Sequence, residues 1–364
     1  MKINAAVVRE SGGSFTLETL ELDEPRADEV LVRISGVGIC HTDLICRDQQ
    51  YPVPLPVVLG HEGSGIVEKV GQDVKGLQAG DPVVLSFCTC GHCDNCLEGL
   101  PSRCLSIFES NFSGCREDGS HTLWHQKDPV SGHFFGQSSF ASHVIAHQKN
   151  TVKVSKDVPI ELLGPLGCGI QTGAGTVMNA LQPEAGSSIA VFGCGAVGLS
   201  AVMAAHTVGC TTIIAIDPNP HRLELASELG ATFTLNPTQA NPVEAIQQQL
   251  PTGVDYSIEC TGIPDVFRQA VDSLSVTGTC ALVGAAPMGT EVSLDMNSIM
   301  FGRSIKGVIE GDSVPQLFIP KLVDLYRSGK FPIDKLVTFY TLDEINQAVQ
   351  DAEQGKVIKA ILRP

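Results

Sequence analysis

The sequence predicts an α/β protein with two domains, one built on a parallel β-sheet and one rich in β-strands. Three observations support this fold class. The chain has 364 residues, and a domain averages roughly 150. The first 165 residues contain short β-like runs between glycine- and proline-rich loops. From about residue 186, strand-like and helix-like segments alternate, which is typical of a parallel sheet with helices on both faces.

The first part of the chain contains two clear strand candidates. EVLVRI (29–34) and GIVEKV (65–70) have the alternating or β-branched character of strands and are bounded by Gly, Pro and Asp. A proline-dense loop, YPVPLPVVLG (51–60), lies between them.

The second part contains strands and helices in turn. Its strand candidates are SSIAVF, TTIIAID, TFTLN, YSIEC and TCALVG. A helix after the first strand is predicted by apolar residues at helical spacing: Val197, Ala201, Ala204, Ala205 and Val208. HRLELASEL (221–229) predicts another helix, which ends at Gly230. The tail from about 310 has mixed character and closes with a strand-like VIKAIL.

The charge balance excludes two classes of partner. The formal net charge is −16, and the isoelectric point is near 5.0. Such a protein repels phosphate backbones and anionic head groups, so we expect neither nucleic-acid nor membrane binding.

Thirteen cysteines are expected to be reduced thiols. The start, MKINAAVVRE, has no apolar stretch long enough for a secretory signal. The longest apolar run, 189–205, falls short of the ~20 residues of a membrane span, and glycines interrupt it. We therefore expect a cytoplasmic protein, in which clustered cysteines indicate metal ligands.

A glycine motif predicts a dinucleotide site. Gly193, Gly195 and Gly198 form GxGxxG between a predicted strand and a helix. In a Rossmann fold these glycines allow a tight turn, let the backbone approach a pyrophosphate and pack the helix close to the strand. Asp217 ends the next strand, where a carboxylate binds ribose hydroxyls and favours NAD over NADP. A plain glycine-rich turn with a surface Asp is the alternative.

A cysteine cluster predicts a structural zinc site. Its spacing is C-x2-C-x2-C-x7-C, and its members are Cys90, Cys93, Cys96 and Cys104. Four thiolates close a tetrahedral shell and leave no position open for chemistry. Idle cysteines or an iron–sulfur cluster are the alternatives, although this spacing is not a usual cluster pattern.

Three scattered residues could form a second metal site. Cys40 in GICHTD, His61 in GHEGSG and Cys168 in GPLGCGI offer two thiolates and one imidazole. Such a set leaves one position for water or substrate. Spacing alone leaves open whether these residues converge.

Several motifs, taken together, resemble one enzyme family. GHEGSGIVEKVGQDV (60–74) resembles the signature G-H-E-x2-G-x5-G-x2-V of the zinc-dependent medium-chain alcohol dehydrogenases. GICHTD, the four-cysteine segment and GCGAVG occur in that family's order. Within the family, FGQSSFASH (135–143) and GRSIKGVIEGDSVPQLFIPKL (302–322) are most similar to aryl-alcohol (benzyl-alcohol) dehydrogenases.

The resemblance implies a domain organisation. A Rossmann domain that binds NAD, residues 170–308, would be inserted into a GroES-like catalytic domain made of residues 1–169 and 309–364. It also implies two zinc ions per subunit and a homo-oligomer, either a dimer or a tetramer.

The resemblance also assigns roles around the catalytic zinc. Cys40, His61 and Cys168 would be its ligands, and Glu62 would lie just behind it. Asp43 would orient His61. Thr42 would take the proton of the alcohol, whose hydride passes to the nicotinamide ring.

The proton path departs from the family pattern. Many relatives place a histidine five residues after the first zinc cysteine, and this chain has Ile45 there. The path would then end in water or at His41, whose ordinary pKa of ~6.5 suits proton exchange. His41 also matches a position where relatives place a cation near the pyrophosphate; a solvated loop histidine is the alternative.

Further coenzyme contacts are expected by resemblance. Arg222 would reach the adenosine ribose, and Lys359 would lie near the pyrophosphate. Val283 and Ala285, which flank Gly284, would offer backbone groups to the carboxamide.

The expected substrate is a benzylic primary alcohol. Ser86 occupies a position where relatives often carry a bulky aromatic side chain, and a small residue would admit a ring. Phe87, Phe140 and Ile309 are candidate walls of that pocket. A general primary alcohol dehydrogenase, a glutathione-dependent formaldehyde dehydrogenase and a non-catalytic zinc- and NAD-binding sensor are the alternatives.

Overall fold

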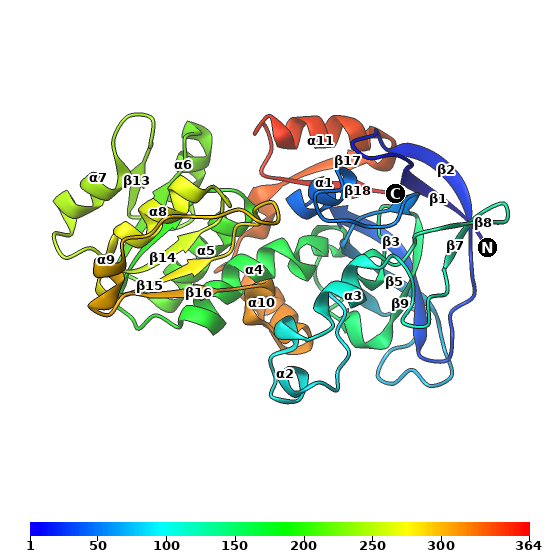
Figure 1. The fold of residues 1–364 in the computed structure, drawn as a ribbon. Helices are drawn as coiled ribbons and strands as arrows, with labels where there is room; N and C mark the ends of the chain where they lie inside the picture. The colour runs from blue at the N-terminus through cyan, green and yellow to red at the C-terminus, as the bar shows by residue number, and fades with distance from the viewer. The chain divides into compact units, whose positions relative to one another are not determined.

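The computed structural model describes all residues from 1 to 364 and confirms the predicted fold class (Figure 1). Its contacts divide the chain into two compact units. The first unit consists of Met1–Gly169, Val314–Ser328 and Ile333–Pro364, and the second of Ile170–Ser313 and Gly329–Pro332. The second unit therefore continues to Ser313, beyond the residue 308 that we expected. Which unit binds which ligand stays a prediction.

The second unit is built on a six-stranded parallel sheet. Its strands lie in the order β13-β12-β11-β14-β15-β16, which is the strand order of a Rossmann fold. The bounds are β11 (Ser188–Phe192), β12 (Thr212–Ile216), β13 (Phe233–Leu235), β14 (Val254–Glu259), β15 (Leu274–Leu282) and β16 (Ser304–Gly307). The first five are the predicted strands, and their continuous apolar runs suit a sheet that is buried on both faces.

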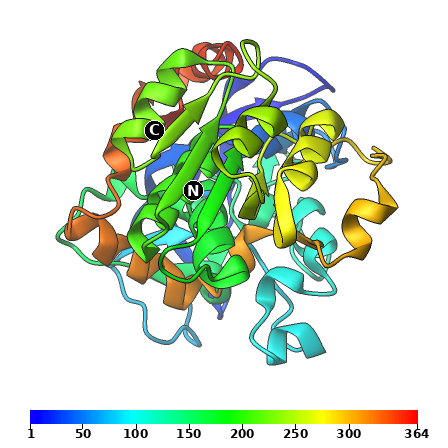
Figure 2. The same cartoon turned by 90° about the vertical axis from the view of Figure 1, so that its left-hand side faces the viewer.

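Helices precede the first of these strands or connect them in turn, and they cover the sheet (Figure 2). They are α4 (Gly169–Gly175), which continues as a π-helix (Thr176–Leu181), α5 (Ala196–Val208), α6 (Pro220–Glu228), α7 (Pro242–Gln249), α8 (Pro264–Asp272) and α9 (Met296–Met300). Side chains of α7 and α8, including Ile246 and Phe267, pack in one apolar cluster with Phe192 and Ile214 of the sheet. Helices α5 and α6 contact β11, β12 and β13. As predicted, α5 and α6 follow the first two strands.

The first unit contains two mainly antiparallel sheets. One has the order β4-β1-β2-β7-β8, and the other β10-β6-β5-β3-β18-β17, with β9 also paired to β3. The bounds of the strands are β1 (Lys2–Val8), β2 (Thr16–Leu22), β3 (Glu29–Gly38), β4 (Val57–Val58), β5 (Glu62–Val70), β6 (Pro82–Leu85), β7 (Leu123–His125), β8 (Asp128–Val130), β9 (His143–His147), β10 (Thr151–Lys153), β17 (Val337–Thr341) and β18 (Lys359–Arg363). The two predicted strands are parts of β3 and β5, which pair with each other.

Short helices complete the first unit: α1 (His41–Arg47), α2 (Asp94–Leu97), α3 (Ile107–Phe112), α10 (Pro315–Arg327) and α11 (Ile345–Glu353). None of the helices of the chain has the length and hydrophobicity that a membrane span requires.

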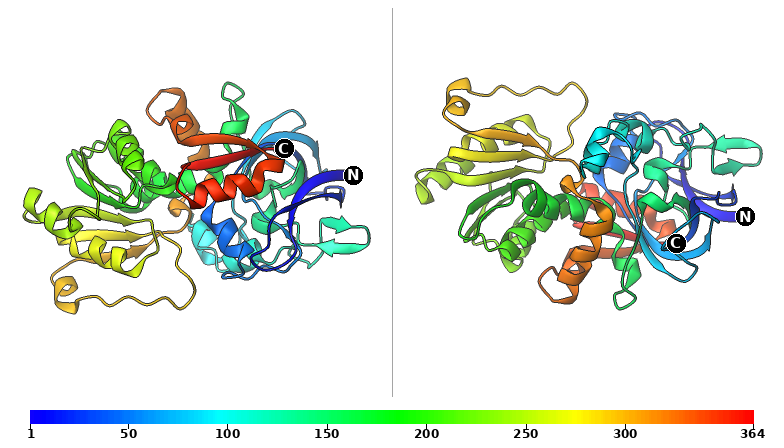
Figure 3. Two further views of the ribbon diagram at one scale, coloured as in Figure 1. Left: turned by 90° about the horizontal axis from the view of Figure 1, so that it is seen from above. Right: turned by 90° about the horizontal axis from the view of Figure 1, so that it is seen from below.

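The end of the chain returns to strands formed near its beginning. Strand β18 pairs antiparallel with β3 at Ile361–Gly38 and Leu362–Val37. In the views from above and below, α11 and β18, drawn in red, lie among the blue strands (Figure 3). This pairing brings Lys359 beside the segment that begins α1.

Candidate metal and coenzyme sites

Cys40, His61 and Cys168 converge in the first unit. Their possible ligand atoms, with a carboxylate oxygen of Glu62, all lie within 4.8 Å of one another. Cys40 is the N-cap of α1, His61 precedes β5, and Cys168 follows a short 3₁₀ turn (Gly164–Gly167). The ligands therefore come from three loops that the sheet of the first unit holds in place.

Asp43 orients His61, as the resemblance implied. Its fully buried carboxylate accepts hydrogen bonds from His61 Nδ1 at 2.9 Å and from the Gly60 amide at 3.0 Å. Its second oxygen accepts from the Cys40 amide at 2.9 Å. With Nδ1 donating to Asp43, Nε2 is the acceptor nitrogen. It is buried and has no hydrogen-bond partner, which suits a metal ligand.

The electrostatics of this cluster favour a bound cation. A hydrogen bond from the Cys168 thiol, followed by the charges of His61 and Lys359, lowers the pKa of the Cys40 thiol well below its ordinary value. Burial alone would lower the pKa of His61, but the charges of Asp43 and Cys40 outweigh burial and raise it. Two thiols and an unpartnered imidazole nitrogen in one buried cluster are the donor set of an open zinc site.

Lys359 has partners beside the metal cluster that the sequence did not indicate. It was expected near a pyrophosphate, but its side chain is only 4% exposed and ion-pairs with Glu62. Its Nζ donates to both Glu62 oxygens at 3.0 and 2.9 Å and to the Ile39 carbonyl at 3.0 Å. Burial alone would lower the pKa of Lys359, but the Glu62 carboxylate outweighs burial and raises it. All three donors of the ammonium group are used in these contacts, and the pyrophosphate contact stays a prediction.

Thr42 and His41 begin helix α1. The Thr42 hydroxyl lies 3.8 Å from Cys40 Sγ, at the edge of the cluster. His41 is exposed to solvent, and Ile45 is buried in the core. Thr42 is therefore close enough to contact a group bound between the ligands, whereas His41 faces solvent.

The pocket walls predicted from the sequence are mostly core residues. Ser86 is fully buried, and its hydroxyl donates to the Gly167 carbonyl at 2.7 Å, so it supports the Cys168 loop. Phe140 is fully buried against Phe15, with ring centroids 5.7 Å apart. Phe87 is buried as well, and Ile309, in the second unit, is half exposed.

Two aromatic residues that sequence reasoning missed surround His61. The Phe135 ring stacks on the imidazole with centroids 4.4 Å apart, and Phe134 meets its edge at 5.4 Å. Gln137 Nε2 donates to the His61 carbonyl at 3.0 Å. The aromatic pair within the polar FFGQSS run was the signal available in the sequence. These contacts keep water from one side of the imidazole.

The four cysteines of residues 90–104, a segment that we call the four-cysteine lobe, also converge. The ligand atoms of Cys90, Cys93, Cys96 and Cys104 lie within 4.8 Å of one another. The Cys90–Cys104 sulfurs are 3.5 Å apart, and the Cys90–Cys96 and Cys93–Cys104 sulfurs 4.0 Å. Zn–S bonds of about 2.3 Å in a tetrahedron require edges of about 3.8 Å. Backbone hydrogen bonds, first from Leu105 and then from Cys96, lower the pKa of Cys93 to about 6, which favours the thiolate.

The glycine motif forms a tight turn between β11 and α5. Gly193 has a positive φ of 92°, and a Cβ on Gly198 would come within 1.8 Å of the Gly193 carbonyl oxygen. A Cβ on Gly195 would meet nothing within 4 Å. Gly193 and Gly198 are therefore required by the fold itself, whereas Gly195 leaves open space above the N-terminus of α5, where Rossmann folds bind a pyrophosphate.

Asp217 and Arg222 lie beside this turn. Asp217 is buried and accepts hydrogen bonds from the Cys194 amide and the Asn219 amide, each at 2.8 Å. The nearest Arg222 nitrogen is 3.6 Å from the carboxylate, and Arg222 Nε is buried without a partner. An Asp at the end of the second strand of a Rossmann sheet is positioned for a ribose hydroxyl.

Glu259 organises the loops at the ends of β14 and β15, a role that sequence reasoning missed. Its buried carboxylate accepts hydrogen bonds from the amides of Thr261 and Gly262. Its backbone carbonyl accepts from Val283 and Gly284, each at 2.9 Å. The loop with Val283 and Ala285 is therefore tied to the end of the neighbouring strand.

Comparison with known families and proteins gives matches along the chain. The alcohol dehydrogenase GroES-like domain matches residues 26–156, and the zinc-binding dehydrogenase family matches residues 196–327. Geraniol dehydrogenase from Castellaniella defragrans is 48% identical over 361 residues, which are 98% of this chain and 96% of that protein. The chain belongs to the zinc-binding alcohol dehydrogenase family.

Solved structures of the dehydrogenase family agree with this fold. A zinc-binding domain alcohol dehydrogenase from Burkholderia ambifaria is 53% identical with a TM-score of 0.98, and covers 100% of this chain and 99% of its own. Benzyl alcohol dehydrogenase from Acinetobacter calcoaceticus is 50% identical with a TM-score of 0.97 and the same coverage. The predicted resemblance to zinc-dependent alcohol dehydrogenases of the benzyl-alcohol type is confirmed.

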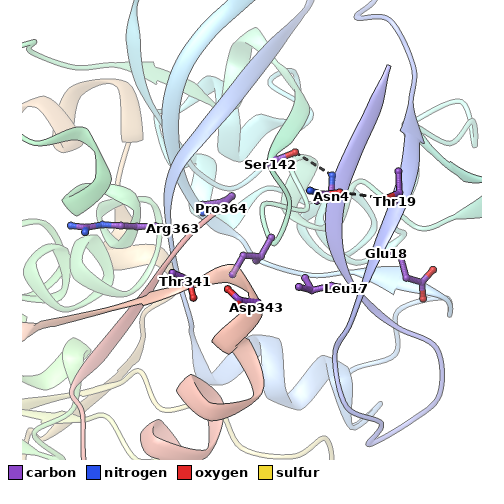
Figure 4. Close-up of a pocket in the computed structure, with 10 residues that line it drawn as sticks. Asn4, Leu17, Glu18, Thr19, Ser142, Thr341, Asp343, Arg363 and Pro364 are labelled. Carbon is purple, nitrogen blue, oxygen red and sulfur yellow. Dashed lines mark hydrogen bonds between the residues drawn. The ribbon is translucent and has the colours of Figure 1, made fainter.

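A surface depression of the dehydrogenase lies apart from these residues. It has a volume of about 530 Å³ and is lined by Asn4, Glu18, Thr341 and Arg363, among others (Figure 4). It contains no cysteine or histidine and none of the predicted site residues. None of the candidate metal ligands therefore lines this depression.

Proposed function

We propose that this zinc-dependent alcohol dehydrogenase uses NAD to oxidise primary alcohols whose carbinol carbon is attached to an aromatic ring. The observation that carries the proposal is the buried convergence of Cys40, His61 and Cys168 around an unpartnered His61 Nε2. This donor set fits a zinc ion that has one position open to an alcohol. The four-cysteine lobe fits a second, structural zinc.

A zinc ion in this site lowers the pKa of an alcohol hydroxyl and makes loss of its proton possible near neutral pH. The residues of the chain then have separate tasks. Thr42, 3.8 Å from Cys40 Sγ, would accept the alcohol proton at its hydroxyl oxygen while its own hydroxyl proton passes toward the ribose of NAD. Asp43 holds His61 Nε2 toward the cysteines. His41, exposed at the start of α1, is the candidate for passing the proton to water.

The glycine turn and Asp217 support NAD as the acceptor of the hydride. A carboxylate at this position binds ribose hydroxyls and repels a 2′-phosphate. In our proposal Arg222 neutralises part of that charge and packs along the adenosine side, and the loop with Val283 faces the nicotinamide end.

The relatives support an activated alcohol as substrate. One is named for benzyl alcohol and another for geraniol. In both alcohols the carbinol carbon adjoins an sp² carbon, which stabilises the aldehyde product by conjugation. An allylic alcohol of the geraniol type is therefore the second candidate substrate.

Initial-rate measurements with a matched panel test the proposal. The panel contains benzyl alcohol, geraniol, cyclohexylmethanol and ethanol, each with NAD and with NADP, followed by absorbance at 340 nm. Cyclohexylmethanol is the control, because it has the size of benzyl alcohol without the conjugation. We expect kcat/KM to be highest for benzyl alcohol with NAD.

Each other outcome identifies an alternative. Values of kcat/KM for cyclohexylmethanol and ethanol that equal the value for benzyl alcohol would indicate a general primary alcohol dehydrogenase. Turnover of formaldehyde only with glutathione would indicate the glutathione-dependent enzyme. No NADH from any alcohol, and none consumed with any aldehyde, would indicate a zinc- and NAD-binding sensor and contradict the proposal.

Self-association and location complete the proposal. Strand β16 is an edge of the parallel sheet, and its backbone pairs on one side only. Met300, Phe301 and Ile305 lie exposed on or just before it. We infer a homo-oligomer with this edge at its interface. Light scattering of wild type and Ile305→Lys tests this inference, because the substitution should lower the molar mass of the particle.

All thirteen cysteines are free thiols, which supports the cytoplasm as the compartment.

A further inference from the structure

The Glu62–Lys359 ion pair contacts the backbone next to every ligand of the Cys40–His61–Cys168 cluster. Glu62 directly follows His61. Glu62 Oε1 accepts a hydrogen bond from the Gly169 amide at 3.0 Å, and Gly169 directly follows Cys168. Lys359 Nζ donates to the Ile39 carbonyl at 3.0 Å, and Ile39 directly precedes Cys40. One ion pair therefore joins three chain segments, each of which carries a single ligand.

Two glycines next to Glu62 leave the space that its carboxylate occupies. A Cβ on Gly38 would come within 2.0 Å of Glu62 Oε2, and a Cβ on Gly169 within 3.0 Å of Glu62 Oε1. Neither glycine has a positive φ, so the missing side chain, and not the backbone conformation, explains glycine at both positions. Glycine at 38 and 169 leaves room for the carboxylate.

The charges of the pair also suit its place. Glu62 is fully buried and Lys359 is 4% exposed. A buried charge without a partner is strongly destabilising, so each member depends on the other. The ammonium group of Lys359 places a positive charge beside the two thiols of the cluster and the Glu62 carboxylate. Its three N–H groups donate to the two Glu62 oxygens and to the Ile39 carbonyl.

We propose that Glu62 and Lys359 are a positioning pair that holds the three ligand loops at the separation a zinc ion requires. The inference rests on the proposed zinc site. It adds a role to Lys359, whose expected pyrophosphate contact stays a separate prediction. The pair acts through the backbone of residues 39, 62 and 169.

Three variants test the pair. Lys359→Met removes the ammonium group. Glu62→Leu with Lys359→Met replaces both charges with apolar groups, and such replacement of a buried ion pair is often tolerated in folding. Gly38→Ala leaves both charges in place but pushes a methyl group against Glu62 Oε2.

The measurement is the rate at which zinc leaves the purified protein for a chromophoric chelator. Wild type should release two zinc ions in two phases, and Cys168→Ser identifies the phase that belongs to the Cys40–His61–Cys168 cluster. Loss of an outer partner of a metal site typically costs 10–100-fold in affinity. We expect that phase to become about 10–100-fold faster in all three variants, while the four-cysteine phase stays unchanged.

Two controls separate positioning from general destabilisation. Arg116 and Glu29 form another buried ion pair in the first unit, at 6% and 5% side-chain exposure, and contact no ligand loop of the cluster. Arg116→Met should lower thermal stability without changing this phase of zinc release. The visible spectrum of the cobalt-substituted protein should shift in the double variant and keep its wild-type shape in Arg116→Met.

Three results would overturn the inference. A folded double variant with wild-type zinc release and cobalt spectrum would exclude a positioning role. Weakened NADH binding in Lys359→Met with unchanged zinc release would return Lys359 to the coenzyme. If wild type holds no zinc that depends on Cys168, the proposed zinc site itself fails and this inference fails with it.

Discussion

Asp43 links three backbone segments through one carboxylate. Its partners are the Cys40 amide, the Gly60 amide and His61 Nδ1. Asn in its place keeps the shape but turns one acceptor into a donor, so one of these contacts is lost and the imidazole is no longer fixed. We expect Asp43→Asn to weaken zinc binding by about 10–100-fold and to lower kcat in parallel.

Zinc affinity by chelator competition and kcat for benzyl alcohol check this prediction. Asp48, in the same part of the chain, pairs with Arg47 at the surface, so Asp48→Asn is the matched control and should change neither value. An unchanged zinc affinity in Asp43→Asn would show that the carboxylate is not needed to orient His61.

Asp217 sets the expected coenzyme preference. Removing its carboxylate in Asp217→Ala should lower kcat/KM for NAD by about 10- to 100-fold, because a hydrogen bond to a charged group contributes ~1.5–3 kcal/mol. Arg222, 3.6 Å away, would then be free to accept a 2′-phosphate. We therefore expect activity with NADP to rise. The double variant Asp217→Ala with Arg222→Ala should lose that gain, and a gain that persists would contradict the role of Arg222.

His133 gives the fold a pH dependence. It is buried, its Nδ1 has no partner, and burial lowers its pKa to about 4. In the unfolded chain its pKa returns to ~6.5. Between these values the unfolded chain binds the extra proton, so the stability of the fold falls as the pH drops from ~6.5 toward ~4.

Urea unfolding of wild type and His133→Phe measures this effect. We expect the free energy of unfolding of wild type to fall by about 2 kcal/mol more than that of the variant between pH 7 and pH 5. Parallel pH profiles would show that burial does not lower the pKa of His133 in the folded protein.

At the scale of elements, two glycines of the turn before α5 are expected to serve different purposes, Gly198 folding and Gly195 coenzyme binding. A methyl group on Gly198 would overlap the Gly193 carbonyl, whereas one on Gly195 would meet open space. We expect Gly198→Ala to lower stability by about 1–3 kcal/mol. Gly195→Ala should change stability by about 1 kcal/mol or less, but should weaken NADH binding, because the methyl group occupies the approach of the pyrophosphate.

Thermal unfolding and NADH fluorescence titration of the two variants check this prediction. If Gly195→Ala binds NADH as tightly as wild type, the pyrophosphate does not approach the turn at that residue.

Elements with a local signal could be predicted from the sequence. The strands of the parallel sheet, helices α5 and α6, and the glycine turn follow from apolar runs, helical spacing and glycine placement within a few residues. The four-cysteine lobe is also local, since its ligands lie within residues 90–104. These features depend on contacts between near neighbours in the chain.

Features that depend on distant contacts could not be predicted in the same way. Nothing local in VIKAIL shows that β18 pairs with β3, so the ion pair of Lys359 with Glu62 could not be predicted. Phe140 resembles a pocket wall in the sequence, but its packing on Phe15 places it in the core. The ring contacts of Phe134 and Phe135 with His61 likewise join residues more than seventy positions apart.

The charge of the whole molecule should influence which alcohols it accepts. A net charge of −16 disfavours the approach of anions over distances of about 10–30 Å at low ionic strength. We expect kcat/KM for 4-carboxybenzyl alcohol to be lower than for 4-methylbenzyl alcohol in 0.01 M salt, and the difference to shrink in 0.15 M salt.

Rates for the neutral alcohol in both salts are the internal control for this comparison. If kcat/KM for the carboxylated alcohol instead falls as the salt concentration rises, a local positive field at the site outweighs the net charge. A substrate of the glutathione-adduct type would then be favoured over benzyl alcohol.

The pairing of Glu62 with Lys359 also determines when the metal site can be completed. The two residues lie 297 positions apart, and the second unit is encoded between them. During synthesis, domains fold as units from the N-terminal side, so the nascent chain carries Cys40, His61 and Cys168 long before Lys359 emerges from the ribosome. Until then Glu62 lacks its counter-charge and the three ligand loops lack their link. If Glu62 and Lys359 are the positioning pair proposed above, we expect zinc loading at this site to be a late step in biosynthesis, after translation of the second unit. The four-cysteine lobe, whose proposed ligands lie within residues 90–104, is expected to take its metal while the chain is still being made.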